Sequence, residues 1–484
     1  MPPLGRPERI DRIRLPPRTA VHAARSDVLV VGGGPAGLGA ALGAARAGAD
    51  AVLVERYGFL GGNATAALVM PLMSFHNEMR TAPPDSANGE GLRLLPTDHG
   101  PGEPVVAGPL KELLERLVEV GGAITPSIDT GYTVPFDPEC YKLATLDLLD
   151  DAGVRFLFHA FASGVAGDGV PDGVVFETKS GPLVVTADEV VDCTGDGDVA
   201  AAAGAPYRPG RDTDGLTQPM TLMFRMVELE RSRFAEYVEN HPGQWRGVNG
   251  LWDLVAEAQA AGELELPRED ILFFATPHER EVSVNSTRVG GLGIDPWDIT
   301  RAEWMTRHQM RQIVRFLRDR VPGFEEAYVA QSGTTVGVRE TRRIIGDYCL
   351  TGEDILSARK FEDAVARGSY PIDIHDPEGK GTVLERLPLR EAYDIPLRCL
   401  LPRGLDRLLV AGRCISGTHE AHSSYRVTPI AMATGHAAGV CAALAALSGR
   451  PAREVPHWEV QRELLRQGAS LRPEIREAVA QRAG

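Results

Sequence analysis

One stretch decides the fold of this chain: Asp27-Val28-Leu29-Val30-Val31-Gly32-Gly33-Gly34-Pro35-Ala36-Gly37. Residues 28–31 form a short apolar, β-branched run, which is typical of a buried parallel strand. The Ala-rich residues 38–47 favour a helix, and Gly48 indicates its end. A second apolar run, Ala51-Val52-Leu53-Val54, predicts the next strand. The sequence therefore predicts a βαβ unit.

The turn between the first strand and the helix has the spacing G-x-G-x-x-G, at Gly32, Gly34 and Gly37. In nucleotide-binding units the first glycine allows a tight turn and the second lets the backbone approach a pyrophosphate. The third lets the helix pack closely on the strand. The helix begins near Pro35 and Ala36, so its free N–H groups and positive dipole end face the pyrophosphate. We therefore predict a dinucleotide site.

An acidic residue ends the second strand. Glu55 lies 18 residues after Gly37, where a carboxylate can bind a ribose hydroxyl. A carboxylate there also disfavours a 2′-phosphate, so we do not expect NADP. The alternative is a Gly-rich turn in another kind of α/β protein. The unit does not separate FAD from NAD, and the chain has no second complete G-x-G-x-x-G.

Length and charge limit the function classes. The 484 residues are enough for roughly two to three domains of ~150 residues each. The formal net charge of −15 disfavours nucleic acid or an anionic membrane as the main partner, because both select for clustered Lys and Arg. Small anionic substrates stay open, since a local cluster can oppose the global charge.

The cysteines and the N-terminal residues bear on the compartment. The six cysteines lie far apart and form no C-x-x-C, so neither a zinc ribbon nor a redox-active disulfide is indicated. We expect a reduced, cytoplasmic setting. The first 25 residues hold no long apolar run, so no signal peptide is expected. We also expect no window of ~18 uncharged apolar residues, and so no membrane span.

Several further motifs carry a resemblance to a known family. They are Gly61-Gly62-Asn63-Ala64-Thr65, the Asp192–Asp198 run, Arg339–Asp347, Tyr370–His375, and Ala411-Gly412-Arg413 followed by Glu420-Ala421-His422 and a long helix. Together with the glycine fingerprint, the chain resembles the FAD-dependent oxidoreductases that belong with the wider glutathione-reductase-like flavoproteins. The resemblance covers nearly all of residues 26–470, except a Pro- and Gly-containing loop at 81–107.

The resemblance implies FAD rather than NAD. It places Glu55 and the fingerprint glycines at the adenosine and pyrophosphate half, the Gly61–Thr65 motif along the path to the flavin ring, and Gly195 and Asp196 over the dinucleotide. Gly412 and Arg413 would flank the pyrophosphate and ribityl chain. The full set of expected FAD contacts is Gly32, Gly34, Pro35, Ala36, Gly37, Glu55, Arg56, Gly61, Gly62, Asn63, Thr65, Thr194, Gly195, Asp196, Gly412, Arg413, Arg426 and Thr428.

The helix that begins near Thr428 supports FAD on physical grounds. Pro429 suits its first turn, where the missing N–H costs nothing. The helix can direct its N-terminus at the pyrimidine edge of a flavin. That edge becomes anionic on reduction, and a helix dipole stabilises such a charge.

We expect an α/β protein with a Rossmann-like FAD-binding domain assembled from separate segments, and an α+β substrate domain. Helical patterns in the second domain occur at about 226–240, 249–262 and 302–320, with β-like runs at 271–275 and 282–285. The predicted divisions are a surface extension at 1–24, the FAD-binding domain at 25–205 and 399–450, the substrate domain at 206–398, and a helical tail at 451–484.

Three histidines are candidates for the base that removes a proton while a C–H gives its hydride to FAD. His419 and His422 lie in a polar turn before the Thr428 helix, so we expect them near the flavin ring, and His375 lies in the substrate domain. The alternative for each is a hydrogen-bonded structural histidine. The pair His419-x-x-His422 lacks a third ligand at recognisable spacing, so no metal is expected.

Arg339, Arg342 and Arg343 are candidates to bind a substrate carboxylate in a bidentate manner. The alternative is pairing inside the protein with Glu340 and Asp347. Arg426 is a candidate for either substrate or FAD.

The leading hypothesis is a flavin-dependent dehydrogenase or oxidase acting on a small organic molecule, with no nucleic-acid or membrane partner. The alternatives are an NAD(P)H-dependent flavin monooxygenase, and an FAD-containing electron-transfer component, which the absence of iron–sulfur cysteine spacing disfavours. Assembly as a homodimer stays open.

Overall fold

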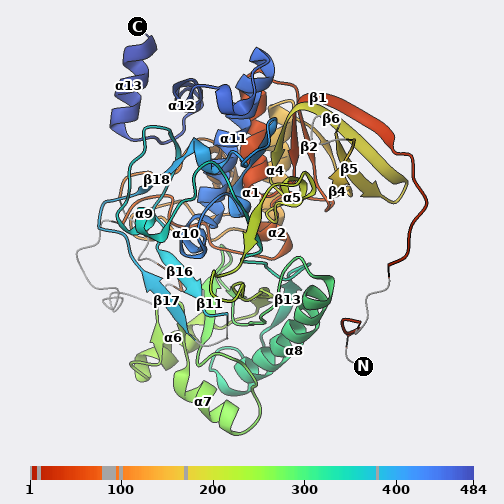
Figure 1. Ribbon diagram of the computed structural model, residues 1–484. Helices are drawn as coiled ribbons and strands as arrows, with labels where there is room; N and C mark the ends of the chain where they lie inside the picture. Colours follow the sequence, from red (N-terminus) through yellow and green to blue (C-terminus); the bar gives the residue numbers. More distant parts are fainter. Residues whose placement is uncertain are drawn as a thin grey trace.

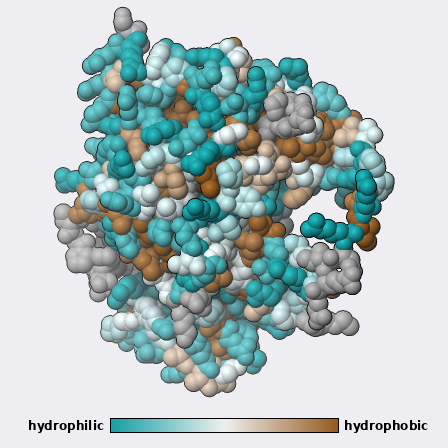
Figure 2. Space-filling model, in the orientation of Figure 1, coloured by the Kyte–Doolittle hydropathy of each residue, from teal (hydrophilic) through white to brown (hydrophobic). Residues whose placement is uncertain are grey.

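The computed structural model describes residues 3–7, 12–78, 94–96, 102–167, 173–377 and 381–483. Most of the predicted 81–107 loop lies outside these residues. Figure 1 shows two parts: an upper one that contains α1, α11 and the strands around β1, and a lower one that contains α6, α7 and α8. Hydrophilic residues cover most of the face seen in Figure 2, and the hydrophobic residues on it are scattered in small groups.

The upper part is built on one sheet with the strand order β3-β2-β1-β6-β5-β4, in which β19 also pairs with β6. β3, β2, β1 and β6 pair in parallel in that order, and β19 also pairs in parallel with β6. β5 pairs antiparallel with β6 on one side and with β4 on the other. The predicted βαβ unit is present. The strands are β1 (Val21–Val31), β2 (Ala51–Val54), β3 (Arg155–Leu157), β4 (Phe161–Val165), β5 (Val174–Thr178), β6 (Gly181–Asp192) and β19 (Leu408–Val410).

The first strand is longer than its apolar run predicts. β1 starts at Val21, and its N-terminal half pairs with β6, for example Val21 with Leu183 and Arg25 with Thr186. The side chains there are largely exposed, so hydropathy gives no sign of a strand. Residues 21–24, expected in a surface extension, are therefore part of the sheet.

Two helices, α1 (Pro35–Arg46) and α11 (Thr428–Ser448), pack on this sheet. They contact each other backbone to backbone. A Cβ added at Gly435 would lie 1.9 Å from the carbonyl oxygen of Ala36, and one at Gly439 would lie 2.0 Å from that of Ala40. A Cβ at Gly39 would lie 2.3 Å from the carbonyl oxygen of Met432. The absence of side chains at these positions lets the backbones of the two helices come into contact.

Helix α11 corrects one expectation from the sequence. Its 21 residues carry no Asp, Glu, Lys or Arg, and by length and hydropathy alone it is long enough to cross a membrane. However, most of its residues are buried between α1, the sheet and the C-terminal helices. The helix is apolar all round because it is surrounded by protein.

The lower part has its own sheet, with the order β13-β8-β12-β11-β10-β9, and its own apolar core. The helices predicted at 249–262 and 302–320 are present, but the first half of the one predicted at 226–240 contains the end of a strand. The elements are β8 (Phe224–Val227), α6 (Arg231–Asn240), β9 (Trp245–Arg246), β10 (Asn249–Gly250), α7 (Trp252–Ala260), β11 (Ile271–Ala275), β12 (Glu281–Val284), α8 (Pro296–Arg320) and β13 (Tyr328–Ser332).

Residues 344–397 connect the two parts. They fall within the predicted substrate domain, yet their buried apolar side chains belong to the core of the upper part. Three antiparallel strand pairs contribute to this region: β7 (Tyr207–Pro209) with β14 (Arg342–Ile344), β15 (Ala364–Gly368) with β18 (Tyr393–Pro396), and β16 (Ile372–His375) with β17 (Thr382–Glu385).

The remaining helices surround these sheets. The predicted polar turn at 414–426 contains a helix, α10, which Thr418 caps by accepting a hydrogen bond from the Ala421 N–H. The predicted C-terminal tail is helical. These helices are α2 (Asn63–Ala66), α3 (Pro109–Glu119), α4 (Pro138–Asp151), α5 (Asp198–Ala202), α9 (Gly352–Leu356), α10 (His419–Tyr425), α12 (His457–Arg466) and α13 (Pro473–Ala483), with short 3-10 turns at Leu397–Cys399, Gly412–Cys414 and Ala452–Glu454.

We predict that Gly439→Ala strongly destabilises the protein, because the new methyl group would overlap a backbone carbonyl that cannot move alone. The expected loss in the free energy of unfolding is roughly 3 kcal/mol, measured by urea unfolding. Gly164→Ala is the control. It adds the same methyl group where no atom lies within 4 Å, and it should change stability by less than about 0.5 kcal/mol. Equal stability of the two variants would contradict the close helix contact.

A buried carboxyl group in β6 gives a second stability prediction. Glu189 is 1% exposed, and neither of its oxygens has a hydrogen-bond partner within the described chain. Burial raises the pKa of Glu189 to about 8, against the opposing charge of Arg407. The folded protein therefore holds this proton more tightly than the unfolded chain does.

The stability provided by this proton is complete below about pH 4.5 and is lost as the pH rises through about 8. Glu189→Gln has no such proton, so its stability relative to the wild type should increase by roughly 3 kcal/mol between pH 5 and pH 8.5. Urea unfolding across this pH range measures the difference. Glu119→Gln, at the exposed end of α3, should follow the wild type. A Glu189→Gln curve parallel to the wild type would show that Glu189 ionises normally.

Candidate functional site

A groove runs along the carboxyl ends of β1, β2 and β6, where the fingerprint turn enters α1. Gly37 is required by packing, since its Cβ would lie 1.7 Å from the carbonyl oxygen of Gly32. Gly34 is different: its Cβ would meet no protein atom closer than 3.6 Å. Gly34 is also the N-cap of α1, so no side chain caps the first turn. The open space and the uncapped helix end fit a bound pyrophosphate.

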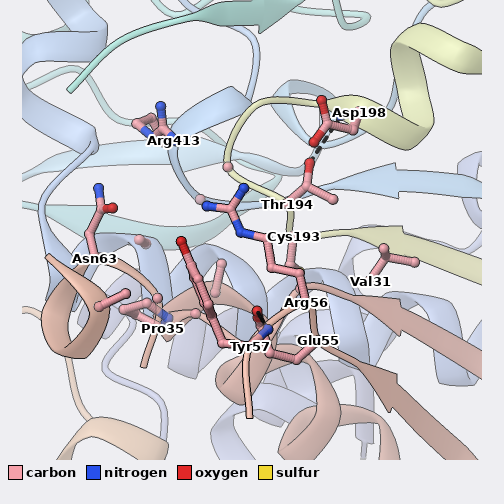
Figure 3. A pocket seen from close by; sticks show the side chains of 18 of the residues that line it. Val31, Pro35, Glu55, Arg56, Tyr57, Asn63, Cys193, Thr194, Asp198 and Arg413 are labelled. Carbon is pink, nitrogen blue, oxygen red and sulfur yellow. Dashed lines mark hydrogen bonds between the residues drawn. The ribbon is translucent and has the colours of Figure 1, made fainter. Parts of the chain in front are cut away.

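Glu55 stands at one end of this groove, after β2. One carboxylate oxygen accepts the Gly33 N–H at 2.6 Å, and the other accepts the Tyr57 N–H at 2.8 Å. Burial raises the pKa of Glu55, while these two hydrogen bonds and Arg56 oppose the rise. Figure 3 shows the Arg56 and Tyr57 side chains pointing into the groove, between Pro35 and Asn63 on one side and Thr194 on the other. The carboxylate is thus fixed in place at the position expected for a ribose contact.

The segment after β3 also lines the groove at this end, through Ala160, Phe161 and Ala162. No pattern in the sequence indicates these residues. β3 pairs in parallel with β2, so the residues after the two strands lie at the same edge of the sheet. Their adjacency depends on this pairing, which the sequence does not give.

The predicted Gly61–Thr65 motif divides into two groups. Gly62 and Asn63 line the groove, and a Cβ at Gly62 would lie 2.9 Å from the Cα of Gly34. Gly61 and Thr65 are not among the lining residues. The Thr65 hydroxyl is buried and donates to the carbonyl of Leu60 at 2.6 Å. The structure therefore corrects the expectation for Gly61 and Thr65: they shape the loop and do not line the path to the ring.

The turn after β6 contributes Thr194, Gly195 and Asp198 to the lining. Asp196, expected over the dinucleotide, instead accepts hydrogen bonds from Arg413 at 2.9 Å and from the Thr341 hydroxyl at 2.7 Å. It is therefore a positioning residue for Arg413, which lines the groove. Asp198 was not among the expected contacts.

The N-terminus of α11 closes the far end of the groove. Its N-cap, Val427, makes no side-chain capping bond, and Thr428 lines the groove together with Gly412 and Arg426. Buried polar atoms here lack hydrogen-bond partners within the described chain: Nη1 of Arg413 and Nε of Arg426. An uncapped helix end and unpaired donors fit a group with acceptor atoms or negative charge, as FAD would provide.

A second, larger cavity of about 1280 Å³ adjoins the groove. The two share the lining residues Asn63, Arg413, Arg426 and Thr428. The cavity extends from there into the lower part of the molecule, where residues of α7, β11 and the Leu264–Asp270 segment form its wall. A ligand in the cavity would therefore meet the end of a dinucleotide bound in the groove.

His375 lines this cavity. Burial, together with the positive charges of Arg339 and Arg426, lowers the pKa of His375 to about 4, against the opposing charge of Asp373. The ring is therefore neutral near pH 7. Nδ1 of His375 lies 3.0 Å from Nη2 of Arg288, and because arginine only donates, Nδ1 accepts. The remaining proton is then on Nε2, which lies 3.5 Å from a carboxylate oxygen of Asp373. In this tautomer His375 donates a hydrogen bond and has no free lone pair to act as a base.

His419 and His422 lie in α10 and line neither the groove nor the cavity. Nδ1 of His419 lies 2.9 Å from a carboxylate oxygen of Glu340. His422 is fully buried with its ring against Tyr425, and burial lowers its pKa well below the usual value. The structure therefore places neither histidine on the lining of the groove or the cavity, where a residue that contacts the ring was expected. Among the described residues, no group of three or more His, Cys, Asp or Glu side chains could hold a metal ion.

The three candidate arginines differ in their contacts. Arg342 donates to Asp198 at 2.8 Å, and Arg343 donates to the carbonyl of Gly417 at 2.7 Å, so both are engaged inside the protein. Arg339 lines the cavity. Its Nη1 donates to the carbonyl of Pro219 at 2.7 Å and to the Thr221 hydroxyl at 2.5 Å. Arg339 is therefore the arginine of this run that can meet a substrate.

Comparisons with known proteins agree with this site. A family model described as FAD dependent oxidoreductase matches residues 27–464, which include the residues of both the groove and the cavity. A comparison with curated proteins gives no match.

Solved structures show distant similarity. A geranylgeranyl bacteriochlorophyll reductase-like protein from Thermoplasma acidophilum is 14% identical, with 95% of this chain and 83% of that chain covered and a TM-score of 0.42. The flavin-dependent brominase Bmp2 is 12% identical, with 90% and 83% covered and a TM-score of 0.45. The p-nitrophenol 4-monooxygenase PnpA from Pseudomonas putida DLL-E4 is 12% identical, with 94% and 92% covered and a TM-score of 0.41.

We predict that Glu55→Ala weakens FAD retention, because it removes the buried carboxylate at the adenosine end of the groove. The dissociation constant for FAD, measured by fluorescence titration of the apoprotein, should rise roughly tenfold or more. Glu55→Gln keeps one acceptor oxygen and should lose less. Glu119→Ala is the surface control. Unchanged flavin occupancy in Glu55→Ala would show that another residue makes the ribose contact.

Proposed function

Since the chain belongs to the family of FAD dependent oxidoreductases, we propose that it is a dehydrogenase or oxidase that moves a hydride from a small organic substrate to FAD. The observation that carries this proposal is the continuity of the groove with the large cavity through Asn63, Arg413, Arg426 and Thr428. A substrate in the cavity would lie beside the end of FAD that reacts. The cavity volume suits an organic molecule.

FAD, when bound, supplies the acceptor for the hydride. The chain's own residues bind and orient both partners. Gly34 and the uncapped end of α1 suit the pyrophosphate, and Glu55 suits the ribose. At the other end, the uncapped N-terminus of α11 and the unpaired donors of Arg413 and Arg426 suit the flavin and its reduction.

The substrate's proton needs an acceptor that faces the cavity, and Asp373 is positioned for that role. A carboxylate oxygen of Asp373 accepts the Tyr370 hydroxyl at 2.8 Å and lies 3.5 Å from both Nε2 of His375 and Nη2 of Arg426. Burial would raise the pKa of Asp373, but His375 and Arg426 outweigh it and hold the pKa below the usual range. Asp373 is therefore ionised at neutral pH and is a weak base.

A weak base is sufficient for this chemistry. When a C–H beside oxygen or nitrogen loses a hydride, the attached O–H or N–H becomes strongly acidic. The proton then transfers readily to a carboxylate that is already ionised and oriented. His375 donates to Asp373 and holds the carboxylate in place, as do Tyr370 and Arg426.

The test is anaerobic mixing of the FAD-loaded protein with a panel of alcohols, amines and hydroxy acids, followed by the flavin absorbance. We expect bleaching by at least one organic substrate and no bleaching by NADH or NADPH alone. Rapid reduction by NADPH, with ¹⁸O from labelled oxygen entering the product, would instead identify a monooxygenase. Reduction only by a redox protein partner would identify an electron-transfer component.

Asp373→Asn tests the proton acceptor. The rate of flavin reduction by the substrate found above should fall roughly 100-fold, while FAD stays bound, because an amide cannot accept the proton. Asp376→Asn, three residues further along the same segment and outside the cavity lining, is the matched control and should reduce at the wild-type rate. Equal rates in both variants would remove Asp373 from the chemistry.

A further inference from the structure

The cavity has a positively charged wall in a protein of formal net charge −15. Arg288, Arg339 and Arg426 line it together with the carboxylate of Asp373, and their charges act on one another. The other charged residues of the lining are Arg268, Arg413, Glu265, Glu269 and Asp270. His375 lies among them and is neutral at pH 7, since burial lowers its pKa to about 4. The local excess of positive charge therefore opposes the charge of the whole chain.

Arg339 is the member of this wall with a free hydrogen-bonding edge. Both of its hydrogen bonds to other described residues come from Nη1, to Pro219 and Thr221. Within the described chain it has no carboxylate partner at ion-pair distance, unlike Arg426, which lies 3.5 Å from Asp373. Its Nε and Nη2 edge makes no hydrogen bond to another described residue, and this edge has the geometry that binds the two oxygens of a carboxylate.

The neighbouring charges add to the case for an anion. Burial, together with the positive charges of Arg426 and Arg288, lowers the pKa of Arg339 to about 9, against the opposing charge of Asp373. Burying an arginine such as Arg339 without a carboxylate partner costs stability unless an anion joins it. A bound carboxylate would supply the missing negative charge.

The position of Arg339 indicates how such a ligand would lie. The preceding residue, Val338, accepts a hydrogen bond at 3.1 Å from Asn63, which lines both the groove and the cavity. Arg339 is thus at the end of the cavity near FAD. Apolar side chains form part of the cavity wall, with Met223, Trp252, Leu266 and Phe274 among them, and the same lining also carries the charged residues Glu265, Arg268, Glu269 and Asp270.

We propose that the substrate is an organic carboxylate with a mainly apolar body: its carboxylate binds the Nε and Nη2 edge of Arg339, and its body extends along the apolar part of the cavity wall. This inference rests on the function proposed above and names its substrate class. It assigns substrate recognition to Arg339, and it makes Arg288 and Arg426 part of the field that attracts the anion.

Ligand binding to the FAD-loaded protein tests this without turnover. The probes are acetate, benzoate and 4-phenylbutyrate, each compared with its primary amide at equal ionic strength, and phenyl phosphate as a different anion. The readouts are the shift of the flavin absorbance and the rise in Tm on ligand binding. We expect benzoate or 4-phenylbutyrate to bind at least tenfold more tightly than its amide and more tightly than acetate.

Variants locate the contact. Arg339→Gln should weaken carboxylate binding roughly tenfold or more and leave amide binding unchanged. Arg339→Lys keeps the charge but loses the planar fork, so it should lie in between. Arg315→Gln removes an exposed arginine from α8, with 83% of its side chain accessible, and should bind like the wild type. FAD content, measured after denaturation, identifies any variant that fails to fold.

The outcomes are distinct from those of the function test. Equal binding of carboxylates and amides, Arg339→Gln binding carboxylates like the wild type, or Arg339-dependent binding of phenyl phosphate alone would overturn the carboxylate assignment. Each of these results is compatible with flavin reduction by a neutral substrate. Conversely, Arg339-dependent carboxylate binding in a protein that no organic substrate reduces would support the assignment and refute the proposed hydride transfer.

Discussion

The whole site depends on the contact between α1 and α11. The two helices are separated by almost 400 residues of sequence, yet glycines on each let the backbone of one touch the other. Their packing on one sheet brings both N-termini to one groove, and neither terminus is capped by a side chain. Two positive helix ends thus face one elongated ligand, one suited to its pyrophosphate and the other to its flavin.

Side-chain contacts between residues far apart in the sequence link the turn after β6 to the two segments that contain Arg413 and Arg342. Asp196, after β6, contacts both Arg413 and Thr341, and Arg342 pairs with Asp198 in the same turn. The position of Arg339 is a consequence of these contacts. Because Arg342 and Arg343 are engaged elsewhere, the run that contains them is fixed, and Arg339 is the residue of this run that lines the cavity.

Local patterns in the sequence predict the parts of the site that depend on neighbouring residues. The strand, glycine turn and helix at 27–47, the acidic Glu55, and the helix from Thr428 with its packing glycines all follow from composition and spacing. Whether the side chains of His419 and His422 line the cavity could not be predicted from local patterns. His419 is fixed by Glu340, 79 residues away, and α10 replaces the expected turn, so both of its histidines lie outside the cavity. Likewise the first half of β1 is exposed, and only its pairing with β6 makes it a strand.

The tautomer of His375 bears on the order of hydride and proton transfer in the proposed reaction. Arg288 occupies Nδ1, so the neutral ring presents Nε2–H toward Asp373 and cannot accept a proton from a substrate. In the proposed reaction the base is Asp373, a carboxylate whose pKa its neighbours hold below the usual range. Such a base does not deprotonate an alcohol or an amine beforehand. It accepts a proton only as the substrate becomes acidic, which happens when the hydride leaves. The arrangement of Arg288, His375 and Asp373 therefore favours hydride departure that precedes or accompanies proton transfer, and it disfavours a mechanism that begins with a substrate anion at the reacting carbon.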